Sequence, residues 1–295
     1  MRVLVTGGAG FIGSNLVEQL LKDNRVTAVR ILDNLATGSL KNLEGFSSNP
    51  KFEFTEGDIR DYKTCAAACE GIDIISHQAA LGSVPRSIND PLTTNDVNIT
   101  GTLNIFTAAK EKSIKRVVYA ASSSTYGDHP GLPKVEDKIG NPLSPYAVTK
   151  YVNELYAKVY ADLYSIELIG LRYFNIFGPK QNPDGPYAAV IPIFAEALLG
   201  NKPPLINGDG HHTRDFTYVD NAVQANILSF FTDNPKAVNQ VYNIACGHKT
   251  SLLELFDGLK KEAGSSLRPT HGPERQGDVK HSLADISKAK GITWL

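Results

Sequence analysis

The chain has few of the features that mark disulfide-rich, membrane-spanning or nucleic-acid-binding proteins. Its 295 residues include only three cysteines, and an odd, sparse set does not make a disulfide framework. Its formal net charge of −1 gives no basic footprint for nucleic acid or for an anionic membrane surface. Its apolar runs are well short of the ~18 residues that a transmembrane helix needs. We therefore expect no nucleic-acid partner and no membrane partner.

The cysteines and the start of the chain bear on metal binding and location. Cys65 and Cys69 are one helical turn apart and have no histidine at a metal-binding spacing, so we expect reduced packing residues and no metal site. The first predicted strand begins at residue 2, which leaves no room for a signal peptide and favours a cytoplasmic location. A hydrophobic fraction of 42% is ample for a core, and 295 residues suit one large or two small domains.

Strand and helix patterns alternate along the chain to about residue 171. The predicted strands are 2–6, 27–32, 51–55, 72–76, 116–121 and 166–171. The predicted helices lie near 12–22, 61–69, 92–111 and 146–164. This alternation predicts an α/β fold with a doubly wound parallel sheet that helices cover on both faces.

The turn between the first strand and the first helix, Thr6-Gly-Gly-Ala-Gly-Phe-Ile-Gly13, carries Gly7, Gly10 and Gly13 at a spacing of three. In a dinucleotide-binding turn, one glycine allows the tight turn, one lets the backbone approach a pyrophosphate, and one lets helix and strand pack closely. The free N–H groups of the helix then face the phosphates. The alternative is a turn without a ligand. We predict a Rossmann-type fold in which the cofactor contacts Gly7, Gly10, Phe11, Ile12 and Gly13.

Asp33 ends the second predicted strand, where an acid binds the ribose hydroxyls of adenosine. No arginine follows it immediately to receive a 2′-phosphate, so the sequence favours NAD over NADP. The alternative is a strand-end turn made with Asn34.

The pattern changes after Arg172, where glycine and proline become frequent. A helix near 219–231 and a strand near 240–244 are expected to return to the sheet. We predict an NAD-binding Rossmann domain at 1–173 plus about 216–246. A smaller substrate-binding lobe is expected at about 174–215 and 247–295.

Tyr146 and Lys150 lie at the predicted start of the helix 146–164. Ser144 suits the N-cap and Pro145 the first helical position, so Tyr146 lies in the first turn. Lys150 is four residues further on and points to the same face. A solvated stripe of alternating charge is an equally good interpretation of this pair alone. That stripe would be Lys150, Glu154, Lys158 and Asp162.

Ser122 favours the catalytic interpretation. It follows the strand 116–121, and the ends of neighbouring parallel strands meet at the crevice where such sheets bind ligands. A hydroxyl there can share a substrate oxygen with Tyr146; a loop cap is the alternative. Lowering a tyrosine pKa from ~10 to about 7 requires roughly 4 kcal/mol. One charge about 4 Å away supplies this at an effective dielectric of about 20. Lys150 and the nicotinamide ring of NAD⁺ could then make Tyr146 a general base.

At these residues the chain resembles an extended short-chain dehydrogenase/reductase, along nearly its whole length. The matching motifs follow the family order: the glycine turn, Asp33, Asp58-Ile59, His77-Gln-Ala-Ala80, the serine loop, Tyr146 and Lys150. The resemblance implies further NAD contacts from Asn34, Asp58, Ile59, Gln78, Ala79, Ala80, Tyr146 and Lys150.

Two later motifs resemble nucleotide-sugar enzymes of the UDP-galactose 4-epimerase group: Arg172-Tyr-Phe-Asn175 and Arg214-Asp-Phe-Thr-Tyr-Val-Asp220. The resemblance implies that Asn175, Arg214 and Arg275 hold the diphosphate, and a guanidinium fork suits phosphate oxygens. A surface ion pair is the alternative for either arginine. The other substrate contacts implied by the resemblance are Ser87, Ser122, Ser123, Tyr146, Asp278 and Ser282.

The reaction implied by the resemblance is inversion at C4 of a UDP-sugar. Tyr146 takes the 4-hydroxyl proton while C4 gives hydride to NAD⁺. The 4-keto sugar turns over, and hydride returns to its other face. Dehydratases and decarboxylases of the group carry an acid in the serine loop. Ser122-Ser-Ser124 offers none, which favours plain epimerisation.

Ser282 bears on the choice of sugar. A tyrosine at this position resembles family members confined to glucose and galactose, whereas a small residue resembles those that accept an N-acetyl group. The strings Gly277–Ser282, Ser83–Ser87 and Asp128–Pro133 look like UDP-N-acetylglucosamine (UDP-GlcNAc) 4-epimerases. We therefore expect interconversion of UDP-GlcNAc and UDP-N-acetylgalactosamine (UDP-GalNAc). Ser282 as plain filler is the alternative.

Three other interpretations stay open from the sequence. UDP-glucuronate 4-epimerases share the serine loop, and UDP-glucose is a third substrate. An NAD-sensing regulatory protein can share the fold, although such proteins usually lose the Tyr146–Lys150 pair. The helix 146–164 is apolar nearly all round outside its charged stripe. The family dimerises through this helix and the one near 92–111, so we expect a homodimer.

Overall fold

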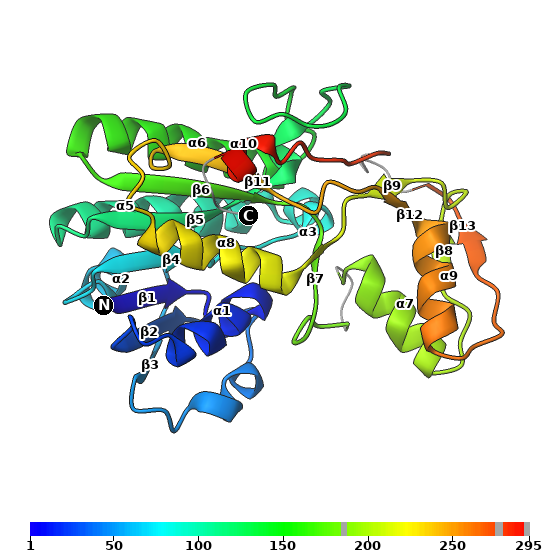
Figure 1. Cartoon of the computed structure of the whole chain (residues 1–295), viewed down its shortest axis with the longest axis horizontal. Coiled ribbons are helices and arrows are strands. Elements are labelled where there is room, and N and C mark those ends of the chain that lie inside the picture. Colours follow the sequence, from blue (N-terminus) through cyan, green and yellow to red (C-terminus); the bar gives the residue numbers. More distant parts are fainter. Residues whose placement is uncertain (184–187, 275–279, 292–295) are drawn as a thin grey trace.

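The computed structural model describes residues 1–183, 188–274 and 280–291 (Figure 1). Its centre is a sheet of seven strands in the order β11-β6-β5-β4-β1-β2-β3, and every neighbouring pair is parallel. The strands are β1 (Arg2–Thr6), β2 (Ala28–Asp33), β3 (Phe52–Glu56), β4 (Ile74–His77), β5 (Arg116–Ser122), β6 (Glu167–Tyr173) and β11 (Gln240–Ile244). The predicted Rossmann-type α/β fold is confirmed.

Helices cover both faces of this sheet because alternate residues of each strand point to opposite faces. On one face, Val3 and Val5 pack with α1 (Phe11–Lys22) and α8 (Val219–Phe231). On the other face, Leu4 packs with α2 (Tyr62–Ala68), α5 (Gly101–Glu111) and α6 (Pro145–Tyr164). Cys65 and Cys69 lie fully buried in this second cluster, and burial raises the pKa of each thiol to about 12. Within the described ranges, no helix has the length and apolar character that crossing a bilayer requires.

The region predicted as one helix near 92–111 is interrupted in the structure. It contains α4 (Pro91–Asn95), a π-helical turn η3 (Asp96–Thr100) and α5, and the short helix α3 (Val84–Asn89) precedes it. The Asn98 side chain accepts a hydrogen bond from Leu81 N at 2.8 Å and donates one to Leu81 O at 3.2 Å. The turn thus presents an amide that holds the loop after β4, which explains the departure from regular helix.

Elements that the sequence did not predict extend away from the sheet (Figure 1). The helices α7 (Val190–Leu199) and α9 (Leu252–Glu262) pack through the buried side chains of Phe194, Leu198 and Phe256. Three two-stranded sheets accompany them: β7 (Ile176–Phe177) with β10 (Thr217–Tyr218), β9 (Thr213–Arg214) with β12 (Thr250–Ser251), and β8 (Leu205–Asn207) with β13 (Thr270–Gly272). A last short helix, α10 (Ser287–Gly291), lies against β11.

Candidate active site

A cavity of about 570 Å³ lies beyond the carboxyl ends of the central strands. It gathers residues that are far apart in sequence, as expected for the crevice of an open parallel sheet. The predicted site residues that line it are Gly7, Gly10, Phe11, Ile12, Gly13, Asp33, Asn34, Asp58, Ile59, Gln78, Ala79, Ala80, Ser122, Ser123, Tyr146, Lys150 and Asn175.

The glycine turn has the geometry that a dinucleotide needs. Gly7 has a φ of +69°, which L side chains rarely adopt, and a Cβ there would lie 2.6 Å from Ala79 N. A Cβ on Gly13 would lie 2.2 Å from Gly7 O. The N-cap of α1 is Gly10, which has no side chain to bond the first N–H groups of the helix. The residues of this first turn line the cavity, and free N–H groups at the start of a helix fit a pyrophosphate.

Asp33 is held with its carboxylate at the end of β2. Its Oδ2 accepts from Ala9 N at 2.9 Å, and its Oδ1 accepts from Leu35 N at 2.8 Å. Burial raises the pKa of this carboxyl group, and the two backbone N–H groups oppose the shift. Each oxygen keeps a further acceptor site, so the carboxylate fits the ribose hydroxyls of a dinucleotide.

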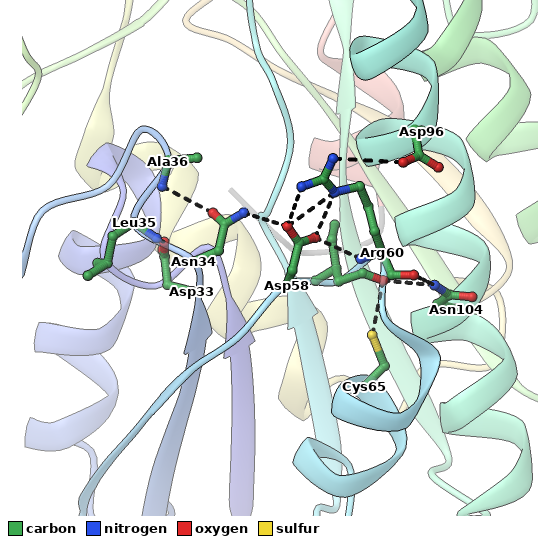
Figure 2. Close-up of polar contacts among 10 residues, drawn as sticks. Asp33, Asn34, Leu35, Ala36, Asp58, Arg60, Cys65, Asp96 and Asn104 are labelled. Carbon is green, nitrogen blue, oxygen red and sulfur yellow. Dashed lines mark hydrogen bonds and ion pairs between the residues drawn. The ribbon is translucent and has the colours of Figure 1, made fainter.

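A second acid is fixed beside Asp33 (Figure 2). The guanidinium of Arg60 donates to both oxygens of Asp58, through Nε at 3.1 Å and Nη2 at 2.7 Å, and Asn34 Nδ2 donates to it at 2.9 Å. The hydrogen bonds from Arg60, opposed by burial, lower the pKa of Asp58 to about 2. Arg60 also pairs with Asp96 at 3.8 Å and lines the cavity. Sequence reasoning missed Arg60, although it directly follows the Asp58-Ile59 motif.

The predicted catalytic side chains come together from two elements. Ser144 caps α6 by accepting from Ala147 N at 3.2 Å, which places Tyr146 in the first turn. The Tyr146 phenol interacts with the side chain of Ser122, the last residue of β5. Ser122 Oγ also accepts from Ser124 Oγ at 2.8 Å. The side chains of Ser122, Tyr146 and Lys150 thus share one cavity.

Lys150 is buried, and its ammonium donates to Ala120 O at 2.8 Å. Burial lowers its pKa to about 8, and the Glu154 carboxylate opposes this shift. Burial also raises the pKa of the Tyr146 phenol, and the Ser122 hydrogen bond opposes that shift. The net change for Tyr146 is opposite to what a general base needs, because burial removes water from a phenolate. The phenol therefore needs nearby positive charge, which Lys150 carries when protonated.

The stripe interpretation of α6 is wrong for its first two members. Lys150 and Glu154 are buried, whereas Lys158 and Asp162 are exposed. Glu154 accepts from Arg172 through Nε at 2.9 Å and Nη2 at 2.7 Å. A charge spacing within one helix could not show this, because the partner of Glu154 lies on β6.

A second cavity, of about 330 Å³, adjoins the first through Asn175, which lines both. Asn175 has a φ of 40°, an uncommon conformation for a residue other than glycine. Arg214 and Phe216 also line the second cavity. The Arg214 guanidinium donates to Thr213 O at 3.0 Å and to Lys280 O at 3.2 Å. The predicted diphosphate contacts Asn175 and Arg214 are thus brought to one place.

Of the four other predicted substrate contacts, the structure describes two, Ser282 and Ser87. Ser282 is half-buried and, like Ser87, is not among the residues that line either cavity; its backbone N donates to Thr213 O at 3.0 Å, beside Arg214. Ser87 is fully buried and its hydroxyl donates to Val84 O at 2.7 Å, so it is not among the residues that line either cavity. Arg275 and Asp278 lie outside the described residues.

Comparison with known proteins agrees with this geometry. The model of the NAD-dependent epimerase/dehydratase family matches residues 3–245. The chain belongs to this family. NAD is therefore its cofactor, and the resemblance found in the sequence is confirmed.

Relatives of known sequence or structure span nearly the whole chain. A putative UDP-glucose 4-epimerase of Methanocaldococcus jannaschii is 42% identical over 99% of this chain and 92% of its own length. The structure of a UDP-GlcNAc 4-epimerase from Methanobrevibacter ruminantium, in complex with UDP-N-acetylmuramic acid, is 40% identical with a TM-score of 0.93. It covers 99% of this chain and 91% of that one. A UDP-glucuronic acid 4-epimerase from Bacillus cereus, with UDP-glucuronic acid and NAD, is 32% identical with a TM-score of 0.92, over 99% and 92%. The chain is thus similar over nearly its whole length to UDP-sugar 4-epimerases.

Proposed function

We propose that this enzyme interconverts UDP-GlcNAc and UDP-GalNAc by inverting C4 through a transient 4-keto sugar. The observation that carries the proposal is the placement of Ser122, Tyr146 and Lys150 in the cavity of the glycine turn. The adjoining cavity holds Arg214, a group suited to a diphosphate. The M. ruminantium relative acts on UDP-GlcNAc, which supports the same sugar here.

Bound NAD supplies the acceptor, and then the donor, of hydride at C4 of the sugar. The glycine turn and Asp33 bind and orient it. Tyr146 takes the proton of the 4-hydroxyl group, and Ser122 donates to the same substrate oxygen while C4 is oxidised. Lys150 keeps a positive charge near the phenol, which favours the phenolate. On return, Tyr146 gives the proton back to the 4-oxygen as C4 is reduced on its other face.

The serine loop favours epimerisation over dehydration or decarboxylation. Those reactions move protons at carbons next to C4 and need an acid or base there. The loop after β5 offers only hydroxyl groups at positions 122–124, and Ser124 Oγ donates to Ser122. Positions 122–124 therefore offer no carboxylate to take up or return a proton at C3 or C5.

The sugar preference rests on the position of Ser282. This short side chain is half-buried next to β9, whose second residue, Arg214, lines the second cavity. A sugar attached to a diphosphate held by Arg214 would then pass close to Ser282, where the small side chain leaves room for an N-acetyl group. The diphosphate role of Arg275 and the substrate contact of Asp278 remain part of the proposal.

We also propose a homodimer. Its interface would consist of α6 and the segment 92–111 of each copy. Exposed apolar side chains run along one side of α6: Val148, Leu155, Tyr156, Val159 and Leu163. Leu92, on α4, is 82% exposed. These positions span roughly 20 Å of helix. A second copy offers an identical apolar face, as a two-fold interface requires.

One assay tests the proposed reaction directly. The protein is incubated separately with UDP-GlcNAc, UDP-glucose and UDP-glucuronate, and proton NMR follows inversion at C4. We expect the fastest turnover with UDP-GlcNAc. Faster turnover of UDP-glucuronate would transfer the proposal to the reaction of the B. cereus relative. If none of the three is turned over, an NAD-sensing regulatory protein is favoured. The Tyr146–Lys150 pair argues against that function, because such proteins usually lose it.

A further inference from the structure

Asp215 is a fully buried acid in the segment between β9 and β10. Its Oδ1 accepts a hydrogen bond from Cys246 N at 3.1 Å. Its Oδ2 accepts from Gly247 N at 3.1 Å and from Ala284 N at 3.2 Å. One carboxylate therefore fixes the loop that follows β11 and the segment near the end of the chain.

The backbone of Asp215 adds a third connection. Its carbonyl accepts from Asn175 Nδ2 at 3.1 Å. Asn175 and its neighbour Ile176 line both cavities, and the left-handed backbone of Asn175 is uncommon unless its surroundings fix it. Asp215 thus joins the end of β6 to the two segments that its carboxylate holds.

The residues on either side of Asp215 in the sequence both belong to the lining of the second cavity. Arg214 and Phe216 both line it. The Arg214 guanidinium is held by Lys280 O, and Ser282 N donates to Thr213 O. The backbones of the segments 213–216 and 280–284 therefore pair at Thr213 and His281, and Asp215 is bonded to the second segment through Ala284.

These donors are backbone amides, so the carboxylate fixes the position of the chain rather than pairing with a cationic side chain. A buried carboxylate is costly unless such bonds satisfy it. Hydrogen bonds to a charged acceptor are stronger and more strictly directed than those to a neutral one. A neutral amide of the same shape cannot accept on both sides, because its NH₂ group would face N–H donors.

We propose that Asp215 is a positioning residue that sets affinity for the UDP part of the substrate, independently of NAD. It does so by holding Asn175, Arg214 and the segment 282–284 around one diphosphate. This inference rests on the proposed function, because it takes Arg214 as a diphosphate ligand. The glycine turn and Asp33 line the first cavity but not the second, and among the hydrogen bonds of the described residues none joins them to Asp215, so NAD binding should not depend on it.

The variant Asp215→Asn tests this inference with little change of shape. Calorimetric titration with UDP should show a Kd raised about tenfold or more, since bonds to a charged acceptor are weakened. The KM for the UDP-sugar should rise in parallel, while kcat changes less. NAD bound per protomer after gel filtration should equal that of the wild type.

Glu136→Gln is the matched control. Glu136 is also buried, and its Oε1 accepts from a backbone amide, Asn243 N, at 2.9 Å. The control changes a buried carboxylate to an amide without touching the bonds around Arg214. We expect its Kd for UDP to equal that of the wild type.

Two outcomes would overturn the inference: an unchanged Kd for UDP in Asp215→Asn, or equal losses of NAD and UDP binding. A general structural role would produce the second. Hydrogen exchange on the wild type gives a test that needs no variant. UDP should slow exchange of the backbone amides at 246–247 and 284 together; a response in one segment alone would contradict the inference.

The same titration separates this inference from the proposed function. A wild type that binds UDP but inverts no sugar refutes epimerisation and leaves the role of Asp215 to be decided by the variant. A wild type that does not bind UDP refutes both.

Discussion

The phenol of Tyr146 interacts with the hydroxyl of Ser122 where the first turn of α6 meets the end of β5. These residues lie on different elements, and the sheet brings them together beside the glycine turn. A phenol, a hydroxyl and a buried ammonium in one cavity are groups that can transfer a proton to and from a hydroxyl group.

Removing the phenolic oxygen should therefore remove the reaction but not the cofactor. Tyr146→Phe should lower kcat by about 10²–10⁴-fold, the usual contribution of a general acid or base. NAD content, measured by absorbance after gel filtration, should be unchanged. Tyr164→Phe, an exposed position on the same helix, should keep full activity. Full activity in Tyr146→Phe would contradict the acid–base assignment.

The activity should fall as the pH rises through about 8. Burial lowers the pKa of Lys150 to about 8, so the ammonium is charged below this pH and loses its proton above it. His77 does not titrate in this range, because burial lowers its pKa to about 3. Since Glu154 raises the pKa of Lys150, Glu154→Gln should move the falling limb of kcat to lower pH.

The control for this shift is Glu167→Gln. Glu167 also pairs with an arginine, Arg116, with the two groups 2.6 Å apart, but it lies at the opposite end of β6 from the cavity. In Glu167→Gln, the falling limb of the kcat–pH profile should stay near that of the wild type. A limb that shifts equally in both variants would show that general destabilisation, rather than the charge of Glu154, is responsible.

The glycine turn should not tolerate a side chain at Gly13. Gly13→Ala places a Cβ 2.2 Å from Gly7 O, so the turn must open. We expect loss of bound NAD and a stability cost of about 1–3 kcal/mol from overpacking. Gly258→Ala, in α9 with open space around the new Cβ, should keep NAD and gain about 0.5–1 kcal/mol. Equal NAD content in both variants would contradict the pyrophosphate role of the turn.

The sugar preference should respond to Ser282. Ser282→Tyr should suppress turnover of UDP-GlcNAc and spare UDP-glucose, because the larger ring fills the space assigned to the N-acetyl group. Ser287→Tyr, at an exposed position nearby, should change neither rate. Equal losses on the two sugars in Ser282→Tyr would remove the specificity argument.

The proposed dimer should dissociate when its apolar face is charged. Leu155→Glu combined with Val159→Glu places two carboxylates on the exposed side of α6, and light scattering should then report a monomer. Leu199→Glu, at a residue of α7 that is 79% exposed, should leave the mass unchanged. A wild type of monomer mass would refute the proposal.

The sequence was sufficient for the central sheet because its strands are short apolar runs between clear turns. The prediction of 2–6 for β1, for example, coincides with the structure. The structure also places the predicted cofactor residues in one cavity, since the ends of parallel strands meet at one edge of a sheet. Local patterns decide such features, and they can be found without tertiary contacts.

Features that depend on distant partners could not be predicted in this way. Glu154 looks like part of a solvated stripe until Arg172 on β6 is placed beside it. The π-helical turn near Asn98 depends on the loop at Leu81. The helix α9 is different, since its capping box of Ser251 and Glu254 is a local signal that sequence reasoning overlooked.

The most direct test of the account follows the hydrogen at C4. The enzyme is incubated with UDP-GlcNAc carrying deuterium at C4, in ordinary water, and NMR measures the label in the UDP-GalNAc formed. Because C4 is oxidised and reduced again within one closed site, the product should keep its deuterium at C4. Replacement of the label by solvent hydrogen, or formation of no UDP-GalNAc, would contradict the account.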